Sequence, residues 1–246
     1  MAKTTMTWTR SEAPARTTVL KALLICGVAA FPLYLAGHLL AGMQLEGYSH
    51  IHQMVSELSA IGAPSQPVAA AFATVYNGLV IAFGIGVWGA AGTKRSLRIT
   101  AIALVACAVI GLLGWFVPMN PRGAERTATD VGHLVYAAAL ILSMLLYMGF
   151  GSDADGIWFR VFSILTILAT LVSGAYTGAQ APRVAEGLPT PWGGAIERVS
   201  VYGPMLWISV LAIVLLRAKK RQEAMPGVMP ELAAGSKAHS KNASNT

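Results

Sequence analysis

The sequence predicts an all-α integral membrane protein, built as one bundle of six transmembrane helices. The chain of 246 residues is 55% hydrophobic and only 12% charged, about half the charged fraction of a soluble domain. It contains separate runs of roughly 20 mostly apolar residues, the length that crosses the hydrocarbon core as a helix. Each run is bounded by charge, glycine or proline, and the connections are too short for a soluble domain.

The six predicted helices occupy Val19–Gly42, Pro67–Gly92, Ile99–Val117, Val131–Phe150, Ile157–Thr177 and Val199–Leu216. The first run follows a basic flank, as a signal peptide would, but it is too long for a signal h-region and no clear cleavage site follows. We therefore expect a retained helix. This divides the chain into an N-terminal arm (1–18), a transmembrane domain (19–216) and a basic tail (217–246) whose composition predicts disorder.

The distribution of lysine and arginine predicts the orientation. An even number of helices puts both termini on one side, and fourteen of the eighteen basic residues lie on that side. By the positive-inside rule both termini are cytoplasmic, in a multi-pass protein of the cell (inner) membrane. The net charge of +7 reflects this topology and needs no nucleic-acid partner, although a weak attraction to anionic membrane lipid is expected.

Polar side chains gather in the outer half of five predicted helices, whereas the inner half is almost entirely Ala, Gly, Leu, Ile and Val. Polar groups are costly in a bilayer, so their positions carry information. We expect a tightly packed inner half and a polar pocket that opens outward. The polar residues are Tyr34, His38, Thr74, Asn77, Asp130, His133, Tyr136, Ser173, Tyr176, Thr177, Gln180, Glu197, Arg198 and Tyr202.

The first outer loop, Tyr48 to Pro67, is predicted to lie over the mouth of this pocket as a short amphipathic helix. Its apolar residues share one arc of a helical wheel, and Ser49 is a plausible N-cap. On a helix His50 and His52 point about 200° apart and cannot share a metal ion, whereas on an extended loop they could. In the remaining alternative, one histidine points into the pocket with Glu57. The apolar arc is Ile51, Met54, Val55, Leu58 and Ile61.

Asp130-x-x-His133 is the strongest candidate for chemistry, because this spacing places a carboxylate and an imidazole on one helix face. In the catalytic interpretation they form the reactive pair, and Glu57 and His52 act from the loop above. In the structural interpretation Asp130 caps the helix N-terminus and His133 is a hydrogen-bonded core group. The two interpretations carry equal weight.

The outer arginines run against the positive-inside trend and form a candidate clamp for an anionic headgroup, with Arg122, Arg126 and Arg198 as its members. They could instead pair with Glu125, Glu186 and Glu197. Glu197 has its own structural interpretation as an acid that favours the helix dipole. The remaining candidates for ligand binding line the predicted pocket: Asn77, His38, Tyr176, Tyr202 and Glu197.

Other motifs carry no chemistry. Gly84-x-Gly86-x-x-Gly89 matches a dinucleotide fingerprint but lies within a predicted transmembrane helix, so we interpret it as a packing face. Cys26 and Cys107 also lie in apolar helices and are expected to be small core residues.

Four short stretches resemble a known family by their order along the chain: Ser56-Glu57-Leu58, Pro118-Met119-Asn120-Pro121, His133 at the start of its helix, and Gly187-Leu188 with Glu197-Arg198. Together they are similar to a large family of six-helix prokaryotic membrane proteins catalogued as a domain of unknown function, DUF998, over roughly Tyr34 to Leu216. Members often have an acid at the position of Asn120. The resemblance implies the six-helix architecture and no particular function.

Three functions stay open on the sequence alone. The first is a protein that binds or modifies a lipid headgroup or a small amphipathic molecule in the outer pocket. The second is a non-enzymatic sensor, transporter or assembly partner, acting with another membrane protein or as a homo-oligomer. Transport is the least favoured of these, since no inverted repeat is visible and the inner half is apolar. The third is a haem protein in which His38 and His133 ligate the iron, or the same pair shares a metal ion.

Overall fold

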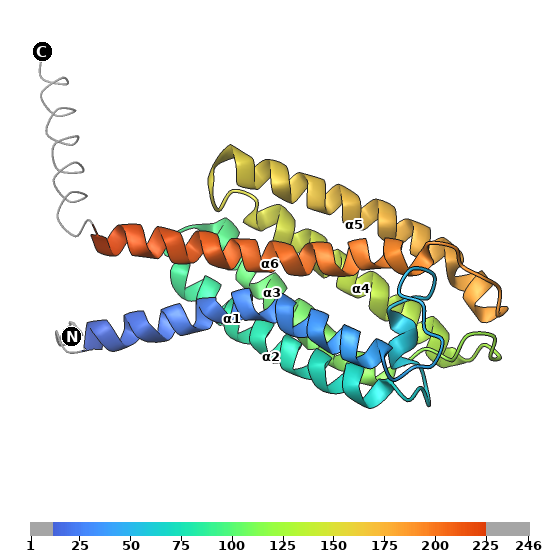
Figure 1. Cartoon of the computed structure of the whole chain (residues 1–246). Helices are drawn as coiled ribbons and strands as arrows, with labels where there is room; N and C mark the ends of the chain where they lie inside the picture. The colour runs from blue at the N-terminus through green and yellow to red at the C-terminus, as the bar shows by residue number, and fades with distance from the viewer. Residues whose placement is uncertain (1–11, 225–246) are drawn as a thin grey trace, which may run out of the picture.

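The computed structural model describes residues 12–224 as a bundle of α-helices (Figure 1). Six of the helices in this part of the chain are long and apolar enough to cross a membrane, as predicted. They are α1 (Glu12–Gly42), α2 (Gln66–Ala90), α3 (Arg95–Leu113), α4 (Ala128–Gly151), α5 (Gly156–Ala185) and α6 (Gly193–Ala224), with short 3-10 helices η1 (Ser56–Ser59) and η2 (Gly114–Phe116).

The helices extend beyond the apolar runs at several ends. Helix α1 begins at Glu12, within the predicted N-terminal arm, and α6 continues to Ala224, within the predicted tail. The rest of the arm (1–11) and of the predicted disordered tail (225–246) lies outside the described residues. Helix propensity explains the extension of α6, because Arg, Ala, Lys and Gln are good helix formers even where the sequence stops being apolar.

Each helix packs against the next along the chain, and α6 returns to pack against α1 (Figure 1). The ends of α1 and α6 that lead to the chain termini lie at the same end of the bundle, which we call the terminus end. The opposite end carries the connections 43–65, 117–127 and 186–192, and we call it the long-loop end. Among consecutive helices, the seam between α4 and α5 is the loosest.

The half of the bundle near the terminus end is filled by large side chains. Trp207 of α6 is fully buried, stacks with Tyr147 and Phe159, and donates its indole N–H to Ser163 Oγ at 2.8 Å. Gly151 leaves room for this ring, since a Cβ there would lie 2.6 Å from it. Large side chains therefore fill the half of the bundle near the terminus end. The sequence predicted such tight packing for the inner half.

The glycines of α2 provide close helix packing, as the sequence predicted for the dinucleotide-like motif. A Cβ on Gly86 would lie 3.0 Å from Leu23 Cβ of α1, and one on Gly84 would lie 3.2 Å from the Ala101 carbonyl oxygen of α3. The two glycines therefore lie on different sides of α2, Gly86 against α1 and Gly84 against α3. Gly78, eight residues before Gly86 on the same helix, is exposed and has no neighbour at this distance in the part of the chain that the structure describes.

The predicted amphipathic helix over the pocket is wrong. Within 48–65 the structure has only the 3-10 turn η1, and the segment before it is irregular. Of the predicted apolar arc, Met54, Val55 and Leu58 are buried, whereas Ile51 and Ile61 are exposed. The sequence therefore predicted burial correctly for Met54, Val55 and Leu58, but the α-helix that it predicted does not form.

The reason is that other parts of the chain bind the backbone carbonyls that a helix would use. Arg198 donates to the carbonyl oxygens of His50 and Gln53. The carbonyl of Ile51 accepts from the Ala195 N–H, and that of His52 accepts from Thr190 Oγ1. The carbonyl of Met54 accepts from Tyr48 Oη. Distant donors thus replace the i→i+4 ladder at residues 50–53, and Tyr48 of the same segment does so at Met54.

Candidate functional site

Two cavities occupy the long-loop half of the bundle and share part of their walls. The inner cavity has a volume of about 230 Å³ and the outer one about 350 Å³. Both are lined by Ser56, His133, Ala137, Ile141, Gly174, Thr177 and Glu197. Because these residues line both, the two cavities adjoin, and we refer to them together as the groove.

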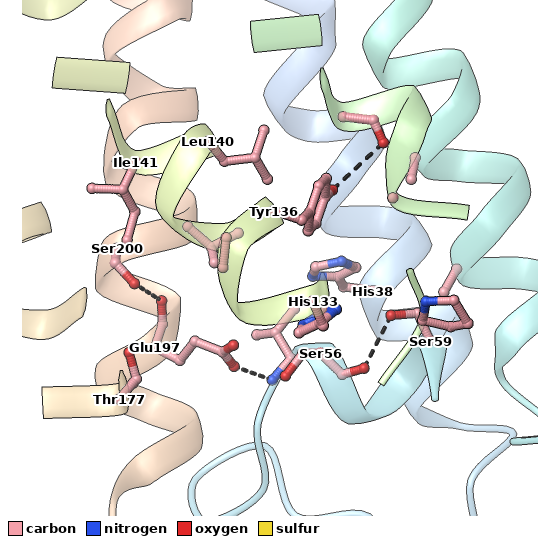
Figure 2. Close-up of a pocket in the computed structure, with 18 of the residues that line it drawn as sticks. His38, Ser56, Ser59, His133, Tyr136, Leu140, Ile141, Thr177, Glu197 and Ser200 are labelled. Atoms are coloured by element: carbon pink, nitrogen blue, oxygen red, sulfur yellow. Dashed lines mark hydrogen bonds between the residues drawn. The ribbon is translucent and has the colours of Figure 1, made fainter. Parts of the chain in front are cut away.

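The inner cavity has polar walls contributed by elements far apart in the sequence. His38 of α1, His133 and Tyr136 of α4, and Glu197 of α6 all line it. Figure 2 shows the two imidazoles and the tyrosine within the bundle, with Glu197 approaching from α6 and Ser56 from the segment before α2. The sequence predicted a polar pocket in this half, and the structure contains a cavity there.

The outer cavity lies between α4 and α5 and is mainly apolar. Its walls include Val131, Leu134 and Ala138 of α4 and Gly178 and Ala181 of α5. Val131 and Leu134 are also exposed on the surface of the bundle, so this part of the groove opens sideways between the two helices. The opening therefore faces the surface that a six-helix membrane protein presents to lipid.

Asp130 and His133 lie where the sequence placed them, at the start of α4, but each is bound by a different partner. Asp130 forms a capping box with Thr127, and it accepts hydrogen bonds from the backbone and side chain of Asn120 at 2.9 and 2.7 Å. His133 Nδ1 lies 3.0 Å from the Val117 carbonyl oxygen. The structure thus gives Asp130 the capping role that the structural interpretation proposed, and leaves His133 Nε2 available to the groove.

Glu57 is buried and is bound by Arg122, so neither is directed to the groove. Two nitrogens of Arg122 donate to the two carboxylate oxygens at 3.0 and 2.6 Å. Arg122 also donates to the Leu188 carbonyl at 2.6 Å and to Thr190 Oγ1 at 3.0 Å. This ion pair joins the three connections of the long-loop end, a role that neither the catalytic interpretation of Glu57 nor the anion clamp anticipated.

Arg198 is turned toward the 48–65 segment as well. Besides the carbonyls of this segment it donates to Tyr48 Oη at 2.9 Å and to His50 Nδ1 at 3.0 Å. Its neighbour Glu197 accepts a hydrogen bond from the Val55 N–H while lining the groove. Arg126, the third arginine of the predicted clamp, is exposed and lines the outer cavity.

The other candidates are dispersed. His52 Nδ1 accepts a hydrogen bond from the Trp192 N–H on an exposed part of the long-loop end. Tyr176 donates to the Pro191 carbonyl at 3.2 Å, and Asn77 is buried and donates to the Ala73 carbonyl at 2.9 Å. Tyr202 Oη lies 3.0 Å from His38 Nδ1, behind the cavity wall that His38 forms.

His38 and His133, the pair of the haem and metal hypotheses, do line the same cavity. The Nδ1 atom of each is held by a neighbour, and the His38 ring stacks on Tyr34 with a centroid separation of 4.0 Å. Within residues 12–224, no group of three or more His, Cys, Asp or Glu side chains is placed to hold a metal ion. A metal at this pair would need ligands from elsewhere.

A family model described as "Protein of unknown function (DUF998)" matches residues 28–214. The chain belongs to this family. The match extends from α1 to α6 and includes both cavities of this family member, in agreement with the resemblance noted in the sequence. No curated protein matches the chain, and a search of solved structures also found no match.

Sequence reasoning missed Ser56, Ser59 and Ser200 as groove residues of this family member. Ser200 follows Glu197 by three positions and so lies on the same face of α6, a spacing that could have identified it. Ser56 and Ser59 had no comparable signal. Their positions depend on the irregular course of the 48–65 segment.

The contact between Arg198 and His50 makes the stability of the long-loop end depend on pH. Burial and the nearby guanidinium lower the pKa of His50 below its usual value of 6.5, and burial raises the pKa of Tyr48 to about 12. His50 Nδ1 must be unprotonated to accept the hydrogen bond from Arg198. Because the folded-state pKa is lower than the unfolded one, the contribution is complete above pH 6.5 and is lost as the pH falls below it.

We therefore expect the wild-type protein to lose thermal stability between about pH 7.5 and about pH 5.5, and His50→Gln to lose less, because a glutamine oxygen can accept from Arg198 at either pH. Melting curves in detergent at the two pH values measure this difference. An equal loss in both proteins would contradict the assignment to His50.

Proposed function

We propose that this protein binds the headgroup end of a lipid, or a small amphipathic molecule, in the groove formed by the two cavities. The observation that carries the proposal is that the two cavities adjoin and share a wall. The inner part receives polar side chains from four helices, and the outer part is mainly apolar and opens between α4 and α5. A molecule with a polar end and an apolar chain matches both parts, and pockets of this kind are the usual sites for such ligands.

We further propose that the groove lies in the outer half of the cell (inner) membrane, with both termini in the cytoplasm. The excess of Lys and Arg at the terminus end supports this orientation. Exposed tryptophans at both ends of the bundle support the placement of these ends at the two membrane interfaces, Trp88 and Trp158 at one and Trp115 and Trp192 at the other. Labelling of an introduced Glu125→Cys by a membrane-impermeant reagent on intact cells tests the orientation. Labelling only after lysis would contradict it.

Gly178→Leu is the sharpest test of the groove. Gly178 lines the outer cavity, and a Cβ there has no atom within 4 Å, so a larger side chain can enter the groove without displacing the helices. We expect molecules that co-purify with the wild-type protein, measured by mass spectrometry, to fall at least about tenfold in the variant. Unfolding should not become easier, because leucine has a higher helix propensity than glycine.

Gly149→Leu is the matched control. Gly149 is also a helical glycine with open space around a Cβ, but it is exposed and lines neither cavity. Retention of bound molecules in Gly149→Leu and their loss in Gly178→Leu is the expected result. If both variants retain them equally, the groove is not the binding site.

Modification of the bound molecule is a second candidate function, favoured by the placement of His133. Its Nε2 is available for proton transfer at the wall that both cavities share. If the protein modifies its ligand, His133→Ala should co-purify a molecule of different mass, the unreacted form. Identical bound molecules in wild type and variant would exclude a catalytic role for His133.

A further inference from the structure

Three of the hydroxyl groups that line the inner cavity, those of Ser59, Ser200 and Thr177, direct their protons to backbone carbonyls. Ser59 donates to the Ser56 carbonyl at 3.0 Å, and Ser200 donates to the Glu197 carbonyl at 2.8 Å. Thr177 donates to the Ser173 carbonyl at 3.0 Å. Since a hydroxyl has one proton and two lone pairs, each of these oxygens can only accept a hydrogen bond from a molecule in the cavity.

The two lining groups on α4 behave in the same way. Tyr136 Oη is directed to the Gly111 carbonyl at 3.5 Å. His133 Nδ1 faces a carbonyl oxygen, which can only accept, so this nitrogen carries the ring proton. In the neutral imidazole Nε2 then presents a lone pair. These five groups, on η1, α4, α5 and α6, therefore present acceptors to the inner cavity.

Glu197 is an acidic group of this wall, and an ammonium group beside it favours its ionised form. Its carboxylate accepts hydrogen bonds from the Val55 N–H and the Ser56 side chain, and a carboxylate has about four acceptor positions. The guanidinium of Arg198, next in sequence, makes its hydrogen bonds to Tyr48, His50, Gln53 and Gly194 instead. Acceptor positions on Glu197 thus stay open to a ligand.

The cations expected to bind an anionic headgroup do not line the inner cavity. Arg122 is paired with Glu57, Arg198 is bound to the 48–65 segment, and Arg126 lines only the outer cavity. A phosphate or carboxylate in the inner cavity would face a carboxylate and several lone pairs. No Lys or Arg side chain of residues 12–224 lines the inner cavity to offset its charge, so burying it there is unfavourable.

Building on the proposed function, we propose that the ligand is an amphipathic amine, whose protonated ammonium group is bound in the inner cavity by Glu197, the His133 Nε2 and the surrounding oxygen acceptors. An ammonium has three donors and a positive charge, which complements this wall. Its apolar chain occupies the outer cavity between α4 and α5. This reverses the charge expected from the sequence, where outer arginines predicted an anionic headgroup.

The test compares three probes with the same chain: decylamine, decanol and monodecyl phosphate. Their affinities for the purified protein are measured near neutral pH from the concentration dependence of the melting temperature, where the amine is protonated. We expect decylamine to bind at least about tenfold tighter than monodecyl phosphate. Glu197→Gln should weaken decylamine at least about tenfold and decanol by less than about threefold, because glutamine keeps an oxygen for the Val55 N–H and removes the charge.

Glu125→Gln is the control for charge. It removes the same charge from an exposed, solvent-screened side chain that lines neither cavity, so decylamine affinity should stay within about twofold. Two outcomes would overturn the amine proposal: monodecyl phosphate binds more tightly than decylamine, or Glu197→Gln binds decylamine as well as the wild type does. In either case the proposed binding groove would still stand if Gly178→Leu loses decanol binding. If none of the three probes binds, the proposed function fails and the amine proposal fails with it.

Discussion

Glu57→Ala is expected to lower the free energy of unfolding by about 3 kcal/mol, since breaking a buried ion pair by removing one partner leaves an uncompensated charge. The charge left behind is Arg122, whose side chain is mostly buried. The variant also removes the acceptor of the Met54 N–H, which is bound to Glu57 at 2.8 Å. Equilibrium unfolding in mixed detergent micelles measures the loss.

The double variant Glu57→Ala/Arg122→Met separates the charge from the packing. If the unpaired guanidinium is the cause, replacing it by a side chain of similar length should recover part of the lost stability. Glu125→Ala, which removes an exposed carboxylate from a neighbouring connection, should change stability by no more than about 0.5 kcal/mol. Glu57→Ala and Arg122→Met are also measured singly. If the stability lost in the double variant equals the sum of the two single losses, the two residues are not coupled.

Gly194→Ala is expected to cost about 2 kcal/mol, the scale of overpacking in a well-packed interior. Gly194 lies in the first turn of α6 against the 48–65 segment. A Cβ there would collide with the Gln53 carbonyl oxygen and would lie 2.8 Å from that of His50. Both neighbours are backbone atoms, so the segment must move away from α6 and give up its hydrogen bonds to Arg198.

Gly203→Ala is the matched control for this variant, on the same helix. Its Cβ would make an ordinary contact, 3.6 Å from Thr166 Cγ2, so the gain in helix propensity should leave stability equal or slightly higher. Hydrogen exchange of residues 50–55 reports the displacement directly. Protection that stays equal in both variants would show that the segment does not depend on its close approach to Gly194.

The helices could be predicted because the signal that defines them is local. An apolar run of sufficient length specifies a transmembrane helix by itself, since a bilayer leaves backbone groups no other partners. The ends of α1 and α6 were placed too far inside the helices, because polar residues with good helix propensity continue a helix after hydropathy falls. The division into a packed half and a half with a cavity followed from the positions of small and polar residues.

The candidate site could be predicted only where its residues share a helix. The spacing of Asp130 and His133 identified one face of α4, and both line the outer cavity. The partner of Glu57 could not be read from the sequence, because Arg122 is 65 residues away and Glu125, Glu186 and Glu197 were equally plausible partners for an arginine. The course of the 48–65 segment was missed for the same reason, since its backbone is bound by distant residues.

The binding of four consecutive carbonyls, those of residues 50–53, by distant donors has a consequence for how the chain assembles. Their donors are Thr190, Ala195 and Arg198, about 140 positions later in the sequence, so the 48–65 segment has little structure to adopt while it is being synthesised. Helices α1 to α5 can form and enter a membrane before any of these donors exists. The cover of the groove is therefore completed last, by the arrival of α6, and the same step brings Glu197 to its wall.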